Sequence, residues 1–452
     1  MKISISHALF IIITLSLVAN SFLIPLNEGL WWDEAVYMKL GQSILQGYYS
    51  LDPGYPVETF RPFVFPFLMS PLSHSLLLAR YAALLIAAIA IIAVYFAARE
   101  VHEKIAKWTA FFTATSYSFV FFSTKVLSES LFIIFLSLSL IFFLRSQKTG
   151  RNKYIVLCGA FSSLALMTRY MGLLIISAYF IYLIYDLYKS RKITRISLFV
   201  ASSFIVALPL FVLGLLYYGD PLGLISTNMF VYGESQITHT FLSGIYQIIN
   251  TWGLLLLLIA AGIFFMRKKM NIFLVMFVIT IAAFLVLPHK EPRYLLSFLP
   301  VYATIAAVGM DDVLNQIKSK NLFSILIIIL LSINIAIGFQ ITFADRTASS
   351  SLVQASLDVK QMTSSDENIL TNAYPYIYYI SERRGIDFPM NPSELMNLID
   401  EESIRFIVIE KLEPSRTEYE KQYFDSNSEF RKVKTYEQWN LEAVVVYELD
   451  QS

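Results

Sequence analysis

The sequence is poor in charge. Only 15% of its 452 residues are Asp, Glu, Lys or Arg, whereas 56% are hydrophobic and the mean hydropathy is +0.59. A soluble domain of this length needs far more polar surface to cover its core. The composition therefore predicts a polytopic α-helical membrane protein. The formal net charge of +1 identifies no partner by itself; we expect a lipid bilayer around the chain and no nucleic acid.

Several chemical classes lack their usual signals. The single cysteine, Cys158, lies in an apolar run, which excludes an intramolecular disulfide and favours a packing role over a thiol mechanism. The sequence has no Gly-rich phosphate loop and no internal repeat. Its histidines are scattered without the spacing of a ligand set. We therefore expect no cofactor, and a divalent metal is compatible with the sequence but not indicated by it.

Long apolar runs dominate the first three quarters of the chain. A bilayer core of about 30 Å needs about 20 apolar residues per helix, which gives about eleven spans, near residues 7–26, 76–98, 109–124, 126–144, 154–168, 170–188, 196–218, 247–266, 272–288, 293–310 and 321–343. Two continuous runs, 109–144 and 154–188, are nearly twice a bilayer span. We interpret each as a tight hairpin that turns at its isolated charges, Lys125 to Glu129 in the first and Arg169 in the second.

Basic residues gather in alternate connections. Clusters near residues 99–107, 145–153, 189–195, 267–269 and 318–320 all fall on one face of the membrane if both hairpins are real, and that face is the cytoplasmic one. The opposite face then holds the 28–74 loop, the two hairpin turns and everything after the last span. We predict a multi-pass protein of the plasma membrane with an extracytoplasmic C-terminus.

The composition changes near residue 345. Polar residues dominate from there, and β-type runs (ENILTN, SIRFIVIEK, AVVVYEL) alternate with helical stretches (YPYIYYISERR, PSELMNLIDEE). The sequence thus predicts a membrane domain over 1–344, including the outer loop 28–74, and a small extracytoplasmic α/β domain over 345–452.

The 28–74 loop carries two candidate site elements. Asp33 and Glu34, in the run LWWDEAVY, can supply a general base at the membrane edge, or they can cap an interfacial helix. Arg61, in FRPFVFP, lies among aromatic residues that would strengthen a contact with phosphate; the alternative is an interfacial arginine that extends its charge to water.

Further ionisable residues lie at turns between apolar helices. Lys125 and Glu129 form one turn and Arg169 another, either at the membrane edge or in a cavity, because a charge at mid-membrane costs roughly 2.5–3.5 kcal/mol on insertion scales. The run PHKEPRYLL contains His289, Lys290, Glu291 and Arg293. Its cations suit a lipid-linked phosphate, and Glu291 can hold either of them; the alternative is a solvated turn that ends two helices.

In order along the chain, the Asp-Glu pair, FRPFVFP, LSESLF, LMTRYMG and HKEPRYLLSFLP resemble the GT-C superfamily of glycosyltransferases, specifically its prokaryotic branch of dolichyl-phosphate-mannose–protein mannosyltransferases and aminoarabinose transferases. The resemblance covers nearly the whole chain. HKEPRY is also similar to the signature turn of mannosyltransferases in glycolipid-anchor synthesis. WWDE echoes the WWD motif of oligosaccharyltransferases, but that motif lies in their C-terminal domain and this run lies in the first outer loop.

The resemblance implies a GT-C fold and an inverting transfer of a sugar from a polyprenyl-phosphate-linked donor to an acceptor hydroxyl on the outer face. The acceptor is a protein, a lipid or a glycan. By the same resemblance Asp33 is the general base and Glu34 positions the acceptor. The donor phosphate is held by Arg61, Arg169, Lys290 and Arg293. Supporting residues are Lys125, Glu129, His289 and Glu291. A transporter or flippase of a lipid-linked sugar is the alternative, although transporters often carry internal repeats and midplane charges.

Overall fold

The computed structural model describes residues 5–52, 58, 60–191, 193–230, 241–253, 255–266, 271–287, 290–317, 319–389, 391–412 and 419–450. His289 lies outside these residues. Contacts divide the chain into two compact units. The helical unit comprises 1–24, 59–65 and 80–342, and the sheet unit comprises 25–58, 66–79 and 343–452.

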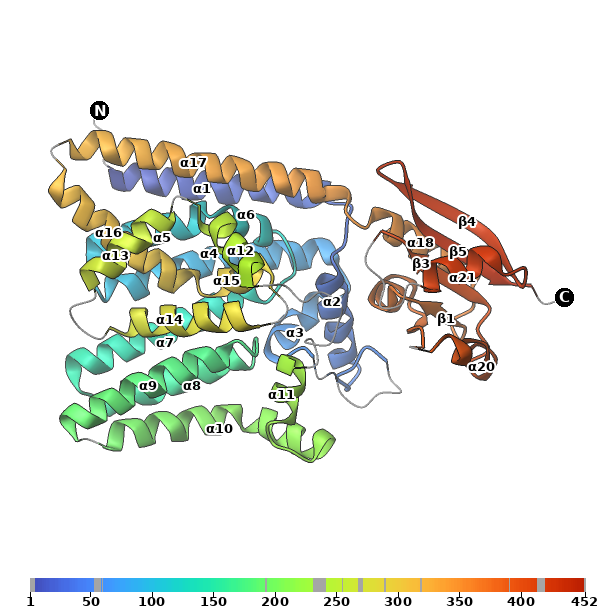
Figure 1. Cartoon of the computed structure of the whole chain (residues 1–452), viewed down its shortest axis with the longest axis horizontal. Helices are drawn as coiled ribbons and strands as arrows, with labels where there is room; N and C mark the ends of the chain where they lie inside the picture. The colour runs from blue at the N-terminus through green and yellow to red at the C-terminus, as the bar shows by residue number, and fades with distance from the viewer. Residues whose placement is uncertain are drawn as a thin grey trace. The chain divides into compact units, whose positions relative to one another are not determined.

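Helices, most of them long, make up the helical unit (Figure 1). They are α1 Ile5–Leu23, α4 Leu76–Arg99, α5 Glu103–Thr115, α6 Tyr117–Phe122, α7 Glu129–Thr149, α8 Asn152–Leu166, α9 Gly172–Ser190, α10 Ile193–Tyr218, α11 Gly223–Phe230, α12 Phe241–Trp252, α13 Leu255–Met266, α14 Ile272–Val286, α15 Pro292–Ser297, α16 Leu299–Gln316 and α17 Lys320–Ala344. Each of the eleven predicted spans overlaps one of these helices or a consecutive pair of them. Both predicted breaks are present, since α6 ends before Lys125 and α8 ends before Arg169.

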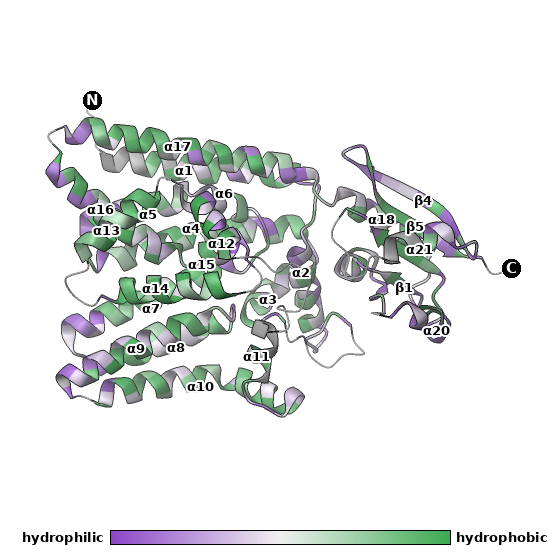
Figure 2. Cartoon of the chain, in the orientation of Figure 1, coloured by the Kyte–Doolittle hydropathy of each residue, from purple (hydrophilic) through white to green (hydrophobic). Residues whose placement is uncertain are grey.

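Five helices of the described part are long and apolar enough to cross a membrane, judged by length and composition: α4, α7, α9, α10 and the helix that begins at Lys320. The pair α12 and α13 passes the same test only as one span bent by 98°. Helices α8 and α14 are apolar but shorter. The total of about eleven spans therefore stays a prediction. Hydrophobic residues dominate these helices, whereas α20 and β4 carry hydrophilic stretches (Figure 2).

Small residues bring two helices of this unit into close contact. A methyl group at Gly262 of α13 would come within 2.0 Å of the Ile305 carbonyl oxygen on α16, and one at Gly309 of α16 within 2.1 Å of the Leu258 carbonyl oxygen. Lipid tails are as apolar as leucine side chains, so helices in a membrane associate through such close packing. These two glycines fix how α13 lies against α16.

The sheet unit contains a five-stranded sheet in the order β2-β1-β3-β5-β4. The strands are β1 Asn368–Thr371, β2 Arg384–Ile386, β3 Phe406–Glu410, β4 Phe430–Gln438 and β5 Leu441–Leu449. Strands β2, β1 and β3 are parallel, and β5 runs antiparallel to β3 and β4. The helices of this unit include α2 Trp32–Leu45, α18 Ser350–Met362, α19 Tyr374–Tyr376, α20 Leu395–Glu401 and α21 Tyr419–Ser426. Helix α3 Val64–Met69 begins in the helical unit and continues into the sheet unit at Pro66.

Three of the strands, β1, β3 and β5, are those that the sequence predicts. Strand β4 was missed because five of its nine residues in succession, Arg431 to Thr435, are exposed and mostly polar, as suits an edge strand. Strand β2 was missed because it is only three residues long, and its first residue closes the stretch YPYIYYISERR that we expected to be helical. The small C-terminal sheet itself is confirmed.

Candidate functional site

The acidic pair lies in the first turn of α2. Asp33 is 7% exposed and Glu34 is fully buried. Trp31 caps the helix, and its backbone N–H donates to Glu34 Oε2 at 3.1 Å. Glu34 therefore fills the capping role that the sequence left open for the pair. Both acidic residues lie in the first turn of the helix, where the helix dipole favours a negative charge.

The residues just before Asp33 are fastened to the beginning of the C-terminal segment. Trp31 Nε1 donates to Asp345 Oδ2 at 2.8 Å, and the Gly29 N–H donates to the Arg346 carbonyl oxygen at 2.8 Å. Gly29 permits this approach, because a methyl group there would lie 2.1 Å from the Ala348 carbonyl oxygen. The sequence gives no local signal for these contacts, since Trp31 and Asp345 are 314 residues apart.

Aromatic side chains of α19 also contact the residues at the start of α2. The Tyr376 hydroxyl donates to the Leu30 carbonyl oxygen at 2.9 Å. The Trp32 ring makes edge-on contacts with Tyr374 and Tyr376, with ring centroids 5.1 and 6.2 Å apart. Tyr376 is thus a positioning residue that the sequence analysis missed. Together with the two backbone and side-chain bonds above, it fixes the N-terminus of α2 within the sheet unit.

Asp52, in the middle of the 28–74 segment, forms an ion pair with Arg384 of strand β2. Arg384 Nε donates to Asp52 Oδ2 at 2.6 Å, and its Nη1 donates to Glu402 Oε2 at 2.9 Å. Burial and the neighbouring Asp52 charge raise the pKa of Tyr378 above its usual range. Burial also lowers the pKa of Lys39 on α2, against the opposing effect of Glu382 and Asp52. These contacts anchor both ends of the segment 29–52 to the sheet.

In the helical unit, Arg169 lies in a buried ion pair. Its Nη1 is 2.7 Å from Glu129 Oε1 and donates to Ser128 Oγ at 3.0 Å; the Arg169 side chain is 12% exposed and that of Glu129 only 2%. The segment that carries Arg61 meets the same turn, because the Val64 N–H donates to the Met167 carbonyl oxygen at 3.2 Å. The structure thus brings the Arg61 segment to the Arg169 turn.

Lys125 lies one turn before this pair and is 1% exposed. Its ammonium group is 5.1 Å from the centroid of the Phe121 ring, a distance at which a cation is attracted to an aromatic face. The Lys125 side chain is therefore packed inside the helical unit, and its place at the membrane edge or in a cavity stays a prediction.

The run around Lys290 forms the start of α15. Pro292 occupies the first turn, where a missing N–H costs nothing. Arg293 and Glu291 form an ion pair, with Nη2 donating to Oε1 at 3.0 Å, so Glu291 holds Arg293. Lys290 is 3% exposed and its Nζ donates to the Leu287 carbonyl oxygen at 2.6 Å.

Helix α15 packs against α6 and α7, between which the Lys125 to Glu129 turn lies. The helical unit therefore gathers most of the predicted phosphate-binding and supporting residues on neighbouring elements. Five of those described are cationic and two are acidic: Arg61, Lys125, Arg169, Lys290 and Arg293 against Glu129 and Glu291. Such a set suits an anion held by charge-assisted hydrogen bonds. Asp33 and Glu34 belong to the sheet unit.

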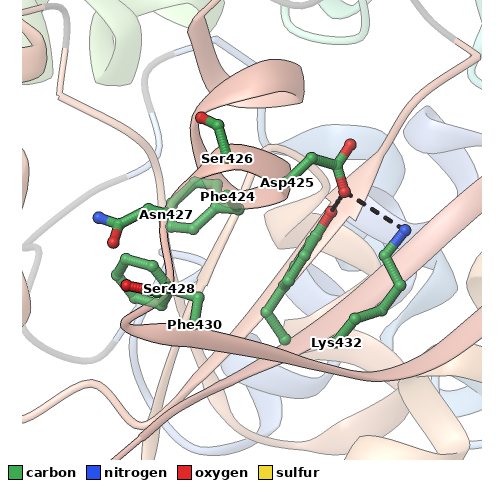
Figure 3. Close-up of a pocket in the computed structure, with 8 residues that line it drawn as sticks. Phe424, Asp425, Ser426, Asn427, Ser428, Phe430 and Lys432 are labelled. Atoms are coloured by element: carbon green, nitrogen blue, oxygen red, sulfur yellow. Dashed lines mark hydrogen bonds and ion pairs between the residues drawn. The ribbon is translucent and has the colours of Figure 1, made fainter.

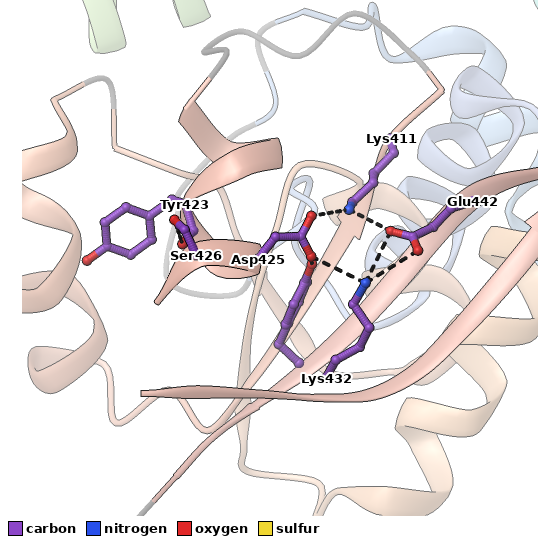
Figure 4. Close-up of polar contacts among 7 residues, drawn as sticks. Lys411, Tyr423, Asp425, Ser426, Lys432 and Glu442 are labelled. Atoms are coloured by element: carbon purple, nitrogen blue, oxygen red, sulfur yellow. Dashed lines mark hydrogen bonds and ion pairs between the residues drawn. The ribbon is translucent and has the colours of Figure 1, made fainter. Parts of the chain in front are cut away.

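One surface pocket, of about 370 Å³, contains none of the predicted site residues. It is lined by Phe424, Asp425, Ser426, Asn427, Ser428, Phe430, Lys432 and Tyr447 (Figure 3). Asp425 and Glu442 alternate with Lys411 and Lys432 in a ring of ion pairs beside it (Figure 4). The four ionisable groups of this ring are paired with one another, so we assign the ring a structural role. Among the described residues, no group of three His, Cys, Asp or Glu side chains could hold a metal ion.

Comparison with known proteins identifies relatives at the level of family and fold. The model of the Alg9-like mannosyltransferase family matches residues 55–376. No curated protein matches the chain. Its structure is similar to that of ArnT from Cupriavidus metallidurans bound to undecaprenyl phosphate, with a TM-score of 0.71, 12% identity and 98% of each chain covered. It is also similar to the Archaeoglobus fulgidus oligosaccharyltransferase in the apo form, with a TM-score of 0.63 and 15% identity over 89% of this chain and 69% of that one. At these identities the two structures show a shared fold.

Proposed function

Because the chain belongs to the Alg9-like mannosyltransferase family, whose fold it shares with other GT-C glycosyltransferases, we propose that it moves a sugar from a polyprenyl-phosphate-linked donor to an acceptor hydroxyl on the outer face of the membrane. The resemblance to GT-C glycosyltransferases drawn from the sequence motifs is confirmed, and the chain is a multi-pass membrane protein of that superfamily. We propose further that the transfer inverts the anomeric carbon and that the sheet unit is extracytoplasmic.

In this mechanism Asp33 takes the proton of the acceptor hydroxyl while the acceptor oxygen forms a bond to the anomeric carbon. The bond between that carbon and the phosphate oxygen breaks on the opposite side, and polyprenyl phosphate leaves with the electron pair. A sugar phosphoester already carries a good leaving group, so the step needs deprotonation and charge stabilisation only. No nucleotide or redox group takes part.

The observation that carries the proposal is the state of Asp33. It is a nearly buried carboxylate in the first turn of a helix whose lead-in is fixed by Trp31, Gly29 and Tyr376. A general base must keep its geometry through the reaction, and fixed partners lower the cost of holding it there. A flexible solvated cap would need no such fastening.

The second part of the proposal assigns the basic residues of the helical unit. Arg61, Arg169, Lys290 and Arg293 hold the donor phosphate and stabilise its growing charge as the bond breaks. Glu129 and Glu291 orient Arg169 and Arg293 through their ion pairs. Lys125 adds to the positive potential. A solved structure of the same fold carries undecaprenyl phosphate, a polyprenyl phosphate, which supports this donor class.

A transfer assay tests the function. The full-length protein in detergent is given radiolabelled polyprenyl-phosphate sugars, mannose first because of the family, with a panel of hydroxyl acceptors. We expect the donor to be consumed and free polyprenyl phosphate to appear. Detergent leaves no compartments, so a transporter consumes nothing there. Tight binding of the lipid-linked sugar without consumption across the panel would contradict the proposal and favour a flippase.

A further inference from the structure

Strands β4 and β5 join through a two-residue turn whose first residue is an exposed tryptophan. Gln438 pairs with Leu441, so Trp439 and Asn440 alone form the turn. Their φ angles are 55° and 63°. Both residues thus lie in the left-handed region that hairpin turns of this length require, where asparagine and glycine are favoured and a bulky side chain is strained.

Trp439 contributes little to the packing of its own domain. Its side chain is 65% exposed, and Leu441, which follows the turn, is 56% exposed. A strained backbone position with a large apolar side chain directed to the surface is costly for folding. A contact between the indole ring and a partner outside the sheet unit would explain why a tryptophan occupies this position.

The turn lies beside the point where the chain leaves α17. Gln438 Nε2 donates to the Thr347 carbonyl oxygen at 3.1 Å, and Gln438 Oε1 accepts from Ser351 Oγ at 2.8 Å. Thr347 is three residues beyond Ala344, the last residue of α17, through a single 3₁₀ turn. At about 2 Å per residue this is about 6 Å. The helix that ends there is among those long and apolar enough to cross a membrane.

The end of α17 has the composition of a membrane–water boundary. Phe343 is 48% exposed, and the Arg346 guanidinium lies 3.7 Å from the centroid of its ring. Aromatic rings settle at the headgroup level, and tryptophan is enriched there because its ring is apolar while its N–H can meet water. Trp439 follows Gln438, whose amide contacts Thr347 just beyond this segment.

We propose that the β4–β5 turn, through Trp439 and Leu441, inserts into the headgroup region of the bilayer and seats the sheet unit on the membrane. The partner is a lipid surface rather than a glycan or peptide. Glu437, near the end of β4, is acidic and exposed, so apolar burial and not attraction to anionic headgroups drives the contact. This inference does not depend on the proposed sugar transfer.

A depth measurement on the full-length protein in liposomes tests the proposal. Cys158 is buried, so a new cysteine is the accessible thiol of the described part. A nitroxide on Trp439→Cys is compared with one on Val433→Cys, a 38%-exposed position six residues back on β4 and thus about 20 Å away. We expect the label at 439 to collide several-fold more with oxygen, and less with a water-soluble nickel chelate, than the label at 433. Salt should leave this difference unchanged.

Equal access of nickel to both labels would overturn the proposal. Protection of the 439 label from oxygen and nickel alike would overturn it too, in favour of a protein or glycan partner. Trp439→Gly supplies an independent readout: glycine relieves the strained φ, so the melting temperature should hold or rise while quenching of tryptophan fluorescence by brominated lipid falls. A lower melting temperature with unchanged quenching would mean that Trp439 serves the fold alone.

Discussion

At the scale of single residues, two arginines of the predicted phosphate site are held by acidic neighbours. Arg169 is paired with Glu129 in a buried pair, and Arg293 with Glu291 in a half-buried one. Removing one partner of a buried pair leaves an uncompensated charge, whereas removing both partners often costs little. Each glutamate therefore has two roles: it stabilises the folded protein, and it orients the side chain of the arginine with which it is paired.

The Glu129 and Arg169 pair gives a stability prediction. We expect Glu129→Gln to destabilise the protein by about 3–5 kcal/mol, because the Arg169 charge is left buried. The double variant Glu129→Gln with Arg169→Met should recover most of that loss. Thermal unfolding in detergent measures both. As a control, Glu103→Gln removes an acid that is 46% exposed and should change stability by about 1 kcal/mol or less. An equal effect at both sites would contradict the buried-pair account.

Arg293 gives a binding prediction. Lysine keeps the charge but loses the planar fork that grips phosphate with two parallel bonds. We expect Arg293→Lys to raise the KM for the lipid-linked donor about tenfold, which corresponds to about 1.4 kcal/mol. Arg145→Lys is the matched control. Arg145 is paired with Glu100 and lies near the C-terminal end of α7, whereas Glu129 lies at its N-terminal end. An unchanged donor KM in Arg293→Lys would remove this residue from the phosphate site.

At the scale of elements, α2 is the part that the sequence describes least well. Its residues are mixed in polarity, and the contacts that fix it come from Asp345, Arg346 and Tyr376, more than 300 positions away along the chain. Local patterns cannot reveal such partners. By contrast, the breaks at Lys125 and Arg169 were predictable, because a charge inside an apolar run has to reach the end of a helix or a cavity.

The contacts that position the N-terminus of α2 can be tested with substitutions of two tyrosines in the sheet unit. Tyr376→Phe removes the hydroxyl bond to Leu30, and we expect kcat to fall about tenfold with the donor KM unchanged, since the base is displaced and donor binding is not. Tyr447→Phe removes the hydroxyl that a similarly buried tyrosine donates to Asp425, and kcat should not change. If both variants lost activity in proportion to their stability, Tyr376 would serve the fold only.

At the scale of the whole molecule, sequence reasoning identified the membrane class, the small sheet and the GT-C family, because each leaves a signal in composition, periodicity or motif. The association of 25–58 and 66–79 with the sheet left no such signal. It depends on contacts such as Asp52 with Arg384, whose partners are each unremarkable in their own segment. The capping contact of Glu34 was left open for the same reason, since a cap and a catalytic acid look alike in sequence.

The ion-pair ring of the sheet unit gives a pH prediction. Burial opposes ionisation of Asp425, but hydrogen bonds from Lys411 and Tyr447 outweigh it and hold its pKa at about 2. An unfolded aspartate titrates near 3.9. A lowered folded-state pKa adds stability above the unfolded value, and that stability is lost as the pH falls through about 4 toward 2. We expect unfolding of this unit to become easier across that window, and less steeply so in Asp425→Asn. An identical pH profile in the variant would contradict the assignment.

The central claim is that Asp33 is the base of a sugar transfer, and the most direct test measures turnover and donor binding in the same samples. We expect Asp33→Asn to bind the polyprenyl-phosphate sugar as the wild type does and to lose transfer by at least about 100-fold, the lower range for a missing general base. Asp400→Asn, at an exposed aspartate on α20, should keep full activity. Full transfer by a folded Asp33→Asn protein would contradict the account.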